Sequence, residues 1–255
     1  MNDQTIFTPF FLDQPLDGLD DLVQPGWIVN RPDLPEGQVQ DRMTALYEPL
    51  AAAVETAVRE GPRPVSMAGD CCASLGMLAG LQRAGVDPKL IWFDAHGDFN
   101  TWETSPSGFL GGMPLAWLVG RGEQTIPQAL GTDSLYEGKV TLTDARDLDP
   151  LEAEAVAGSV MNHLKLVTNL SSAPLPWGPL WVHFDVDVID VVEAPAVSYP
   201  AAGGPSTPIL GEVFQYLAAS RQVMAVSVSL WNPALDSDGQ TQKVVLNLLH
   251  SLLAR

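Results

Sequence analysis

The sequence predicts an α/β fold in which helices cover both faces of a mostly parallel, doubly wound sheet. Apolar segments of strand length alternate with segments of helical spacing along most of the 255 residues, and this alternation is typical of parallel sheets. The strand segments are short continuous apolar runs, which indicates strands buried on both faces. Apolar residues make up 46% of the chain, enough for a large core. Because no clear linker interrupts the pattern, we expect one domain, residues 1–255.

The predicted elements follow one another in a regular order. The stretch 13–38 is rich in proline, glycine and aspartate, and we expect an extended loop region there. Residues 41–59 have helical spacing and include a proline that can kink a helix. Strands are expected at Val65–Met67, Leu90–Phe93, Lys139–Leu142, Leu180–Phe184 and Val223–Leu230. Helices are expected to begin at Ser74, Gly112, Pro150, Pro208 and about Gln240.

The composition argues against several classes of function. A formal net charge of −18 disfavours binding to nucleic acids or to anionic membrane surfaces, because both need basic patches. No apolar run reaches the roughly 18–20 residues that span a bilayer, and the N-terminus lacks the basic segment of a signal peptide. Cys71 and Cys72 are adjacent and cannot form a disulfide bond that links distant parts of the chain, which fits a reducing compartment. We expect a cytoplasmic protein whose partner is a small-molecule substrate.

Potential metal ligands follow two of the predicted strands. In an extended segment alternate side chains share a face, so the ligand candidates would converge within each cluster. These candidates are Asp94, His96, Asp98 and Asn100 after the first strand, and Asp185 and Asp187 after the second. Carboxylates packed this closely repel one another unless a cation lies between them. Two cations that share bridging carboxylates can also hold a hydroxide.

A less specific interpretation has to be weighed against the metal site. A single Asp-x-Asp pair or a lone histidine is more often a turn, a cap or a surface residue. Here two such clusters occur, and each lies directly after a buried strand, where doubly wound sheets bind their ligands. The combination therefore favours a metal site.

At this point the chain resembles the ureohydrolase family, which includes arginase, agmatinase and formimidoylglutamase. The resemblance rests on IWFDAHGDFN (91–100), TSPSGFLGGMPL (104–115), RDLDPLE (146–152), HFDVDVID (183–190), SYPAAGG (198–204) and LWNP (230–233). It implies a three-layer α/β/α sandwich, two Mn²⁺ ions, and a bridging hydroxide that attacks a guanidinium carbon. It also implies a homo-oligomer, a trimer or hexamer of closed symmetry.

The resemblance assigns ligands to both ions. One ion would be held by Asp94, His96, Asp185 and Asp187. The other would be held by Cys71, Asp94, Asp98 and Asp185. Asp98 would also have the catalytic role of accepting a hydrogen bond from the bridging hydroxide.

Cys71 departs from the family pattern, because the family has a metal-binding histidine at this position. A thiolate can replace that histidine, although it prefers zinc or iron to manganese. The alternative is that Cys71 is a small buried hydrophobic residue at a tight strand-to-helix junction. We expect Cys72 to be a packing residue.

The substrate side is conserved only in part. Asn100, Ser107 and Asp149 match family residues that contact the substrate. Gly111 falls where the family has its catalytic histidine, Phe109 replaces an asparagine, and Leu230 replaces the glutamate that anchors a guanidinium. These changes predict a more apolar and roomier pocket, suited to a neutral or weakly charged amidine, amide or formimidoyl group.

Three hypotheses about function follow. The first is a binuclear metallohydrolase that cleaves a linear non-peptide C–N bond in a substrate other than plain arginine. The second is a metal-binding pseudoenzyme with a structural or regulatory role, and the third is a true arginase.

We expect His183 on the opposite strand face from the carboxylates, as a packed histidine, with a replacement acid–base role as the alternative. His163 and His250 lie outside all motifs and are expected to be structural or on the surface.

Overall fold

An eight-stranded sheet forms the centre of the protein. In the computed structural model, which describes residues 2–172 and 175–254, its strands are all parallel and lie in the order β4-β1-β5-β10-β9-β6-β7-β8. Their bounds are β1 (Asp3–Thr8), β4 (Ile28–Val29), β5 (Arg63–Ala68), β6 (Lys89–Asp94), β7 (Val140–Asp144), β8 (Asn162–Leu164), β9 (Leu180–Asp185) and β10 (Val223–Ser229). A separate antiparallel pair is formed by β2 (Phe10–Phe11) and β3 (Gln14–Pro15).

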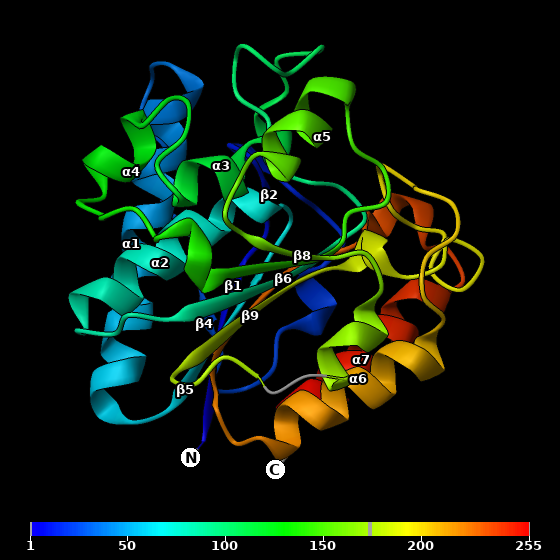
Figure 1. Ribbon diagram of the computed structural model, residues 1–255. Helices are drawn as coiled ribbons and strands as arrows, with labels where there is room; N and C mark the ends of the chain where they lie inside the picture. Colours follow the sequence, from blue (N-terminus) through cyan, green and yellow to red (C-terminus); the bar gives the residue numbers. More distant parts are fainter. Residues whose placement is uncertain (1, 173–174, 255) are drawn as a thin grey trace.

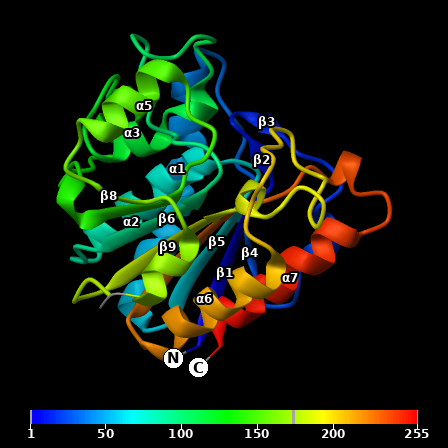
Figure 2. The same cartoon turned by 45° about the vertical axis from the view of Figure 1, so that its right-hand side comes forward.

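Helices cover both faces of the sheet, which confirms the predicted three-layer α/β/α arrangement (Figures 1 and 2). One face packs against α1 (Val39–Glu60), α2 (Ser74–Arg83), α3 (Pro114–Leu118), α4 (Thr125–Ala129) and α5 (Pro150–Ala157). The other face packs against α6 (Thr207–Ala219) and α7 (Gln240–Leu253). Each interface contains its own hydrophobic core, because successive strand side chains point to opposite faces. Among the described residues, no helix combines the length and the apolar character needed to cross a membrane.

Most of the predicted elements are present, but several observed elements were not predicted, among them β8 and α4. The helix 41–59 is observed as α1, which continues through Pro49. Strand β1 was not predicted, since its first half is polar and its buried residues are concentrated in its second half. The region 13–38 is mainly loop, as expected, but it contains β3, β4 and the short 3-10 helix Asp20–Leu22. The helix expected from Gly112 is only the five-residue α3.

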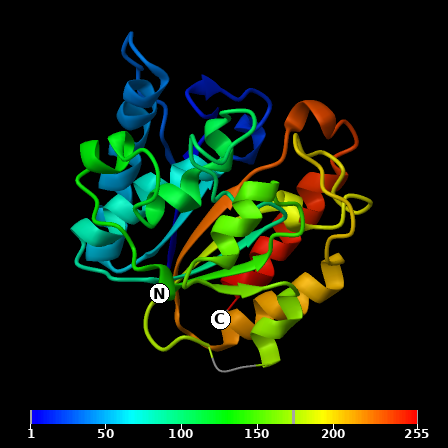
Figure 3. The same cartoon turned by 45° about the horizontal axis from the view of Figure 1, so that its top comes forward.

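The topology determines where a site can form. β5 continues into α2 and β6 leads to α3, both on one face, whereas β9 and β10 lead to α6 and α7 on the other. The chain therefore leaves β10 and β9 towards one face of the sheet and leaves their neighbours β5 and β6 towards the other face. Doubly wound sheets bind ligands at such switch points, at the carboxyl edge of the strands. The loop after β9 and the segment after β10 lie side by side at this edge (Figures 1 and 3), joined by a bond from Asn232 N to Ala196 O of 2.8 Å.

Candidate metal centre

A cavity of about 230 Å³ opens at the carboxyl edge of the four central strands. It is lined by every residue that the sequence singled out as a ligand or substrate contact: Cys71, Asp94, His96, Asp98, Asn100, Ser107, Asp149, Asp185 and Asp187. They come from segments far apart in the chain, since β5, β10, β9 and β6 are neighbours in the sheet but not in the sequence. The structure therefore brings the predicted residues together in one place, while their roles stay predictions.

Each of the two acidic motifs begins with the same local turn. Asp94 Oδ1 accepts a hydrogen bond from the backbone N–H of His96 at 2.7 Å. Asp185 Oδ1 accepts one from Asp187 N at 2.9 Å. The strands end at Asp94 and Asp185, and Asp98 has a left-handed backbone with φ of 50°. The prediction that an extended segment aligns these side chains was therefore wrong; turns bring them together instead.

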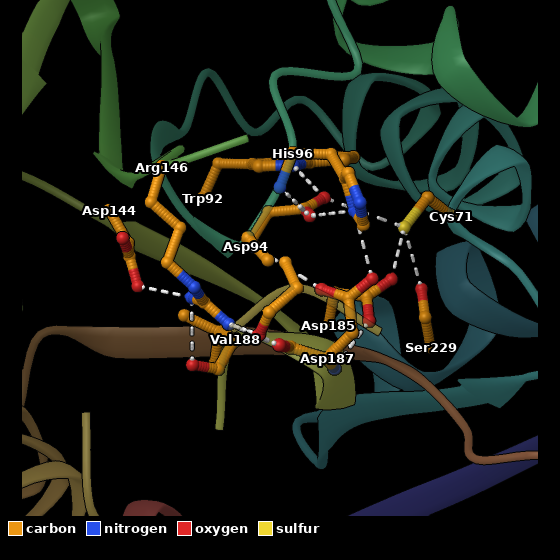
Figure 4. Close-up of polar contacts among 12 residues, drawn as sticks. Cys71, Trp92, Asp94, His96, Asp144, Arg146, Asp185, Asp187, Val188 and Ser229 are labelled. Atoms are coloured by element: carbon orange, nitrogen blue, oxygen red, sulfur yellow. Dashed lines mark hydrogen bonds and ion pairs between the residues drawn. The ribbon is translucent and has the colours of Figure 1, made fainter. Parts of the chain in front are cut away.

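Three groups of potential ligands lie close enough to hold a metal ion. Within each group the donor atoms are within 4.8 Å of one another, and the groups are Asp94/His96/Asp187, Cys71/Asp94/Asp98 and Cys71/His183/Asp185. Figure 4 shows the side chains of Cys71, Asp94, His96, Asp185 and Asp187 converging at the ends of their strands. The shared members join the groups into one cluster.

The electrostatics of the cluster indicate a missing positive charge. Burial, followed by the charge of Asp187, raises the pKa of Asp185 to about 8. Burial, followed by the charge of Asp94, raises the pKa of Asp187 to about 6. Burial alone would lower the pKa of His96, but its contacts with Asp187 and Asp94 raise it overall to about 12. A protonated His96 offsets only part of the acidic charge.

Asp98 gives the most direct evidence that a cation fits. Burial, followed by the charges of Asp94 and Asp185, raises its pKa well above the usual range. Its Oδ2 atom is buried and has no hydrogen-bond partner within the described residues. A buried carboxylate oxygen without a partner is costly, and a metal ion would satisfy it. Carboxylate and imidazole donors of this kind suit a divalent cation.

The strand-to-helix junction explains why Cys71 reaches the cluster. Gly69 donates its backbone N–H to Phe10 O at 3.0 Å, and a Cβ atom at Gly69 would lie only 2.3 Å from that oxygen. Asp70 then caps the next turn by accepting bonds from Cys72 N at 2.8 Å and Leu12 N at 2.6 Å. The chain therefore enters a 3-10 turn at Cys71 with its side chain facing the cavity.

The two cysteines have different surroundings. Cys71 Sγ lies 2.8 Å from Asp185 Oδ2 and 2.9 Å from Ser229 Oγ. Burial, followed by the charge of Asp185, raises the pKa of the Cys71 thiol well above its usual range. Cys72 is fully buried, and its Sγ lies 3.6 Å from Leu110 O. Cys71 therefore belongs to the acidic cluster, whereas the position of Cys72 agrees with the packing role predicted for it.

His183 corrects one prediction. We expected it on the opposite strand face from the carboxylates, but it is two residues before Asp185 and shares that residue's face. Its ring stacks on Trp92 with centroids 3.7 Å apart, and its Nε2 lies 3.3 Å from Cys71 Sγ. Burial lowers the pKa of His183 to about 3, so the imidazole is neutral. Counting alternate residues back from Asp185 would have found it.

Arg146 is a further residue that the sequence analysis did not identify. All of its guanidinium N–H donors are used: they bind Asp144 Oδ2 and four backbone carbonyl oxygens, those of Asp187, Val188, Ala201 and Ala202. Figure 4 shows the bonds to Asp144 and to the turn that follows β9. Arg146 therefore fixes the backbone that presents Asp187. No metal or substrate chemistry predicts such a residue from sequence.

The predicted substrate residues form a polar side of the cavity. Asn100 Nδ2 donates to Asp149 Oδ2 at 3.0 Å. Asp149 is the N-cap of α5 and forms a capping box with Glu152, which holds it at the start of the helix. Ser107 Oγ accepts a bond from Phe109 N at 3.2 Å. His163 bonds Asp144 O from β8 and lies outside this cavity.

Part of the cavity lining is apolar, as predicted, but the cavity is not roomier at Gly111. A Cβ atom at Gly111 would lie 2.4 Å from Cε1 of Phe109, so the Phe109 ring fills the space that a side chain would use. That ring stacks with Phe11 at 6.2 Å and contacts Tyr199 at 5.2 Å between centroids. Leu230 is a further apolar residue of the lining. The expectation of a larger pocket was therefore wrong at this position.

A cluster of buried acids and an imidazole at the carboxyl edge of a doubly wound sheet is the arrangement of a candidate metalloenzyme. Residues 22–254 match the profile of the Arginase family. The arginase of Bacillus caldovelox is 30% identical over 227 residues, which cover 80% of this chain and 73% of the relative. The arginase of Bacillus subtilis is 30% identical over 220 residues, covering 82% and 74%. The chain belongs to the arginase family of ureohydrolases.

Solved structures agree with this assignment. A crystal structure of arginase from Bacillus subtilis superposes with a TM-score of 0.84 at 28% identity, covering 100% of this chain and 99% of that chain. The formimidoylglutamase of Bacillus subtilis superposes with a TM-score of 0.71 over 99% of this chain and 88% of that chain, at 14% identity. The second likeness shows the fold alone.

Proposed function

We propose that the protein is a binuclear metal-dependent hydrolase that cleaves a linear non-peptide C–N bond of the guanidino, amidine or formimidoyl type. The observation that supports this most strongly is the cluster of three buried carboxylates, those of Asp94, Asp98 and Asp187, and the half-buried Asp185 with His96 and Cys71 around a single cavity. Membership of the arginase family supports the reaction class. We further propose a small-molecule substrate, a cytoplasmic location and a trimer or hexamer of identical chains.

Two cations would be held by this cluster. Asp94, His96, Asp185 and Asp187 would hold one ion, and Cys71 would hold the other together with Asp94, Asp98 and Asp185. Mn²⁺ is the ion expected at the first position, with zinc or iron as alternatives at the Cys71 position. When bound, such ions supply Lewis acidity and a nucleophilic hydroxide at neutral pH.

Asp98 is the residue to which we assign a catalytic role. Its buried Oδ2 has no partner among the described residues, so it is free to accept a hydrogen bond from the attacking oxygen. On the polar side of the cavity, the Asn100–Asp149 pair and Ser107 are available to orient the substrate. These residues bind and position the substrate, and Asp98 accepts the hydrogen bond.

The apolar side of the cavity disfavours arginine as the substrate. Leu230 and Phe109 offer no charge to a guanidinium, and a buried charge without a partner is costly. A neutral or weakly charged amidine, amide or formimidoyl group avoids that cost. We therefore propose that the substrate is not plain arginine.

The alternative function is a metal-binding pseudoenzyme with a structural or regulatory role. Gly111 supports it, because a position without a side chain cannot transfer a proton, and losing such a group lowers rates by roughly 10²–10⁴. The intact set of ligand candidates supports the hydrolase instead, since a purely structural role does not require an open cavity beside the ions.

Metal analysis followed by a substrate screen tests the proposal. The protein is purified with Mn²⁺, its metal content is measured, and urea, ammonia and formamide release is assayed over guanidino, formimidoyl and amide compounds. We expect two ions per chain and turnover of at least one non-arginine compound within the usual enzymatic range of roughly 1–10³ s⁻¹. Two bound ions without any turnover would favour the pseudoenzyme, and an absence of bound metal would contradict both functions.

A further inference from the structure

Cys71 lies between two possible metal positions rather than beside one. Besides its group with Asp94 and Asp98, it belongs to a second group with His183 and Asp185. The Sγ atom is 3.3 Å from His183 Nε2 and 2.8 Å from Asp185 Oδ2. Neighbouring S and N ligands of a tetrahedral zinc ion lie about 3.5 Å apart, given bond lengths of about 2.3 and 2.0 Å. The sulfur and the imidazole are thus already near ligand spacing, whereas the carboxylate oxygen lies closer to the sulfur than that spacing.

The structure holds the His183 ring in a fixed orientation. The ring stacks on Trp92 with an interplanar angle of 19°. Its Nδ1 lies 2.8 Å from Ser227 Oγ, which also accepts a bond from Trp181 Nε1 at 2.9 Å. Histidine ligands are commonly oriented by a hydrogen bond of the ring nitrogen that does not bind the metal. Ser227 can make that bond, which leaves Nε2 directed at Cys71.

The donor atoms on the two sides of the cluster differ in kind. Asp94, His96 and Asp187 offer carboxylate oxygens and one imidazole nitrogen. The group of Cys71, His183 and Asp185 offers sulfur, nitrogen and oxygen. Thiolate and imidazole ligands suit zinc and iron, whereas carboxylates suit manganese.

We propose that His183 is a metal ligand, and that it forms with Cys71 and Asp185 a position selective for Zn²⁺ or Fe²⁺. The position of Asp94, His96 and Asp187 then takes the harder ion, so the centre contains two different metals. This inference deepens the proposed function and rests on its metal centre. Asp98, which shares a ligand group with Cys71 and Asp94, supplies a further carboxylate near the Cys71 position.

Metal competition in the full-length protein tests the proposal. The protein is stripped with a chelator and supplied with Zn²⁺ and Mn²⁺ together, and each bound metal is quantified. We expect one zinc ion per chain, and His183→Gln should weaken zinc binding roughly tenfold or more, at least the loss seen for residues that only orient a ligand. His163→Gln is the matched control, since the His163 ring bonds Asp144 O outside the cavity and its loss should leave zinc binding unchanged.

Cobalt serves as a spectroscopic probe of the same position. Co²⁺ bound in place of zinc should give a thiolate-to-cobalt charge-transfer band, and His183→Gln should shift the visible ligand-field bands. Cys71→Ser should remove the charge-transfer band while His183 stays in place. Unchanged ligand-field bands in a folded His183→Gln protein would overturn the proposal.

A measurement on the unmodified protein does not depend on how the variants fold. In the competing tautomer, Ser227 donates its hydroxyl proton to Nδ1, and His183 Nε2–H donates to the Cys71 sulfur. ¹⁵N NMR of the zinc-loaded protein distinguishes the two states: an unprotonated, metal-shifted Nε2 supports the proposal, and a protonated Nε2 overturns it.

Zinc bound through His183 without C–N hydrolysis would contradict only the proposed function. Hydrolysis with Mn²⁺ in both positions, unaffected by His183→Gln, would contradict only this inference.

Discussion

The floor and the wall of the cavity obey different physical constraints. We define the floor as Cys71, Asp94, His96, Asp98, Asp185 and Asp187, and the wall as Phe11, Phe109, Tyr199 and Leu230. The floor concentrates acids whose pKa values are raised first by loss of solvent and then by one another's charge. The wall is an aromatic and aliphatic surface held by ring packing.

The difference teaches that reaction chemistry and substrate choice can change independently. A floor side chain has to provide a charge or a lone pair for an ion, so few residue types fit it. A wall side chain only has to fill space, so Phe109 can occupy the volume that Gly111 leaves free. Under the proposed function, the floor would set the class of reaction and the wall would set the substrate.

Removing one acid from the floor should have the largest effect. Asp94 belongs to two of the three ligand groups, so Asp94→Asn should lower the metal content. A metal ion stabilises the charge of the transition state by several kcal/mol, and losing that stabilisation lowers turnover by about 10³-fold or more. Turnover of the best substrate from the screen and metal analysis measure both effects. The exposed Asp133→Asn is the control, and an Asp94→Asn protein that kept two ions and full activity would refute the metal assignment.

Placing a charge on the wall should change the substrate preference. Leu230→Glu offers a guanidinium the carboxylate that the wall lacks, and a hydrogen bond to a charged group contributes about 1.5–3 kcal/mol. We expect kcat/KM for guanidino compounds, relative to neutral amides, to rise roughly 10–100-fold. Leu230→Gln has similar size without the charge and should not produce the change. An unaltered ratio in Leu230→Glu would mean that the guanidinium does not approach this side of the wall.

Adding a single carbon to the wall tests whether Phe109 and Gly111 are coupled. Gly111→Ala should destabilise the protein by about 1 kcal/mol, the low end of the cost of overpacking, because its Cβ meets the Phe109 ring. Gly112→Ala is the matched control, since its Cβ would come no closer than 3.9 Å to Asn100 Nδ2. Denaturant unfolding measures the difference, and Phe109→Ala should abolish the cost of Gly111→Ala. Equal stabilities of the two alanine variants would disprove the coupling.

The metal-free floor should show a dependence of stability on pH. Asp185 has a folded pKa raised to about 8, so its contribution to stability is lost as pH rises from its unfolded pKa, near 4, towards 8. His96, raised to about 12, acts in the same direction above its unfolded pKa near 6.5. The thermal midpoint of the metal-free protein should therefore fall between pH 5 and 8, by at least about 2–4 °C for each 1 kcal/mol. Mn²⁺ should reverse the trend, and a midpoint that rises with pH without metal would contradict it.

The parts of the structure that follow from local patterns could be predicted from the sequence. Buried strands appear as continuous apolar runs, and α5 begins at Pro150, where the sequence predicted a helix; Asp149 caps it. The two acidic motifs were recognisable because each follows such a strand. β1 was missed because its first residues are polar and only Ile6, Phe7 and Thr8 are buried.

The remaining features depend on which distant segments meet. The sequence shows that Gly111 has no side chain, but only the tertiary structure shows that Phe109 fills the space. Arg146 acts through backbone carbonyls of a loop 41–56 residues away, and no residue type in that loop indicates it. His183 could have been placed beside Cys71 only by combining strand alternation with the order of β5, β10 and β9.

The position of β10 has a consequence for how the protein is made. β10 lies between β5 and β9, yet among the strands that the structure describes it is the last to leave the ribosome. Until residue 229 has emerged, the segments that end in Cys71 and Asp185 have no strand to join them, and their edges stay open. When β10 inserts between β5 and β9, it pairs with segments that are far away in the sequence, and such pairing makes folding slow. Metal capture should therefore be a late event in biosynthesis, and nascent chains that stop before β10 should neither retain the ions nor escape aggregation.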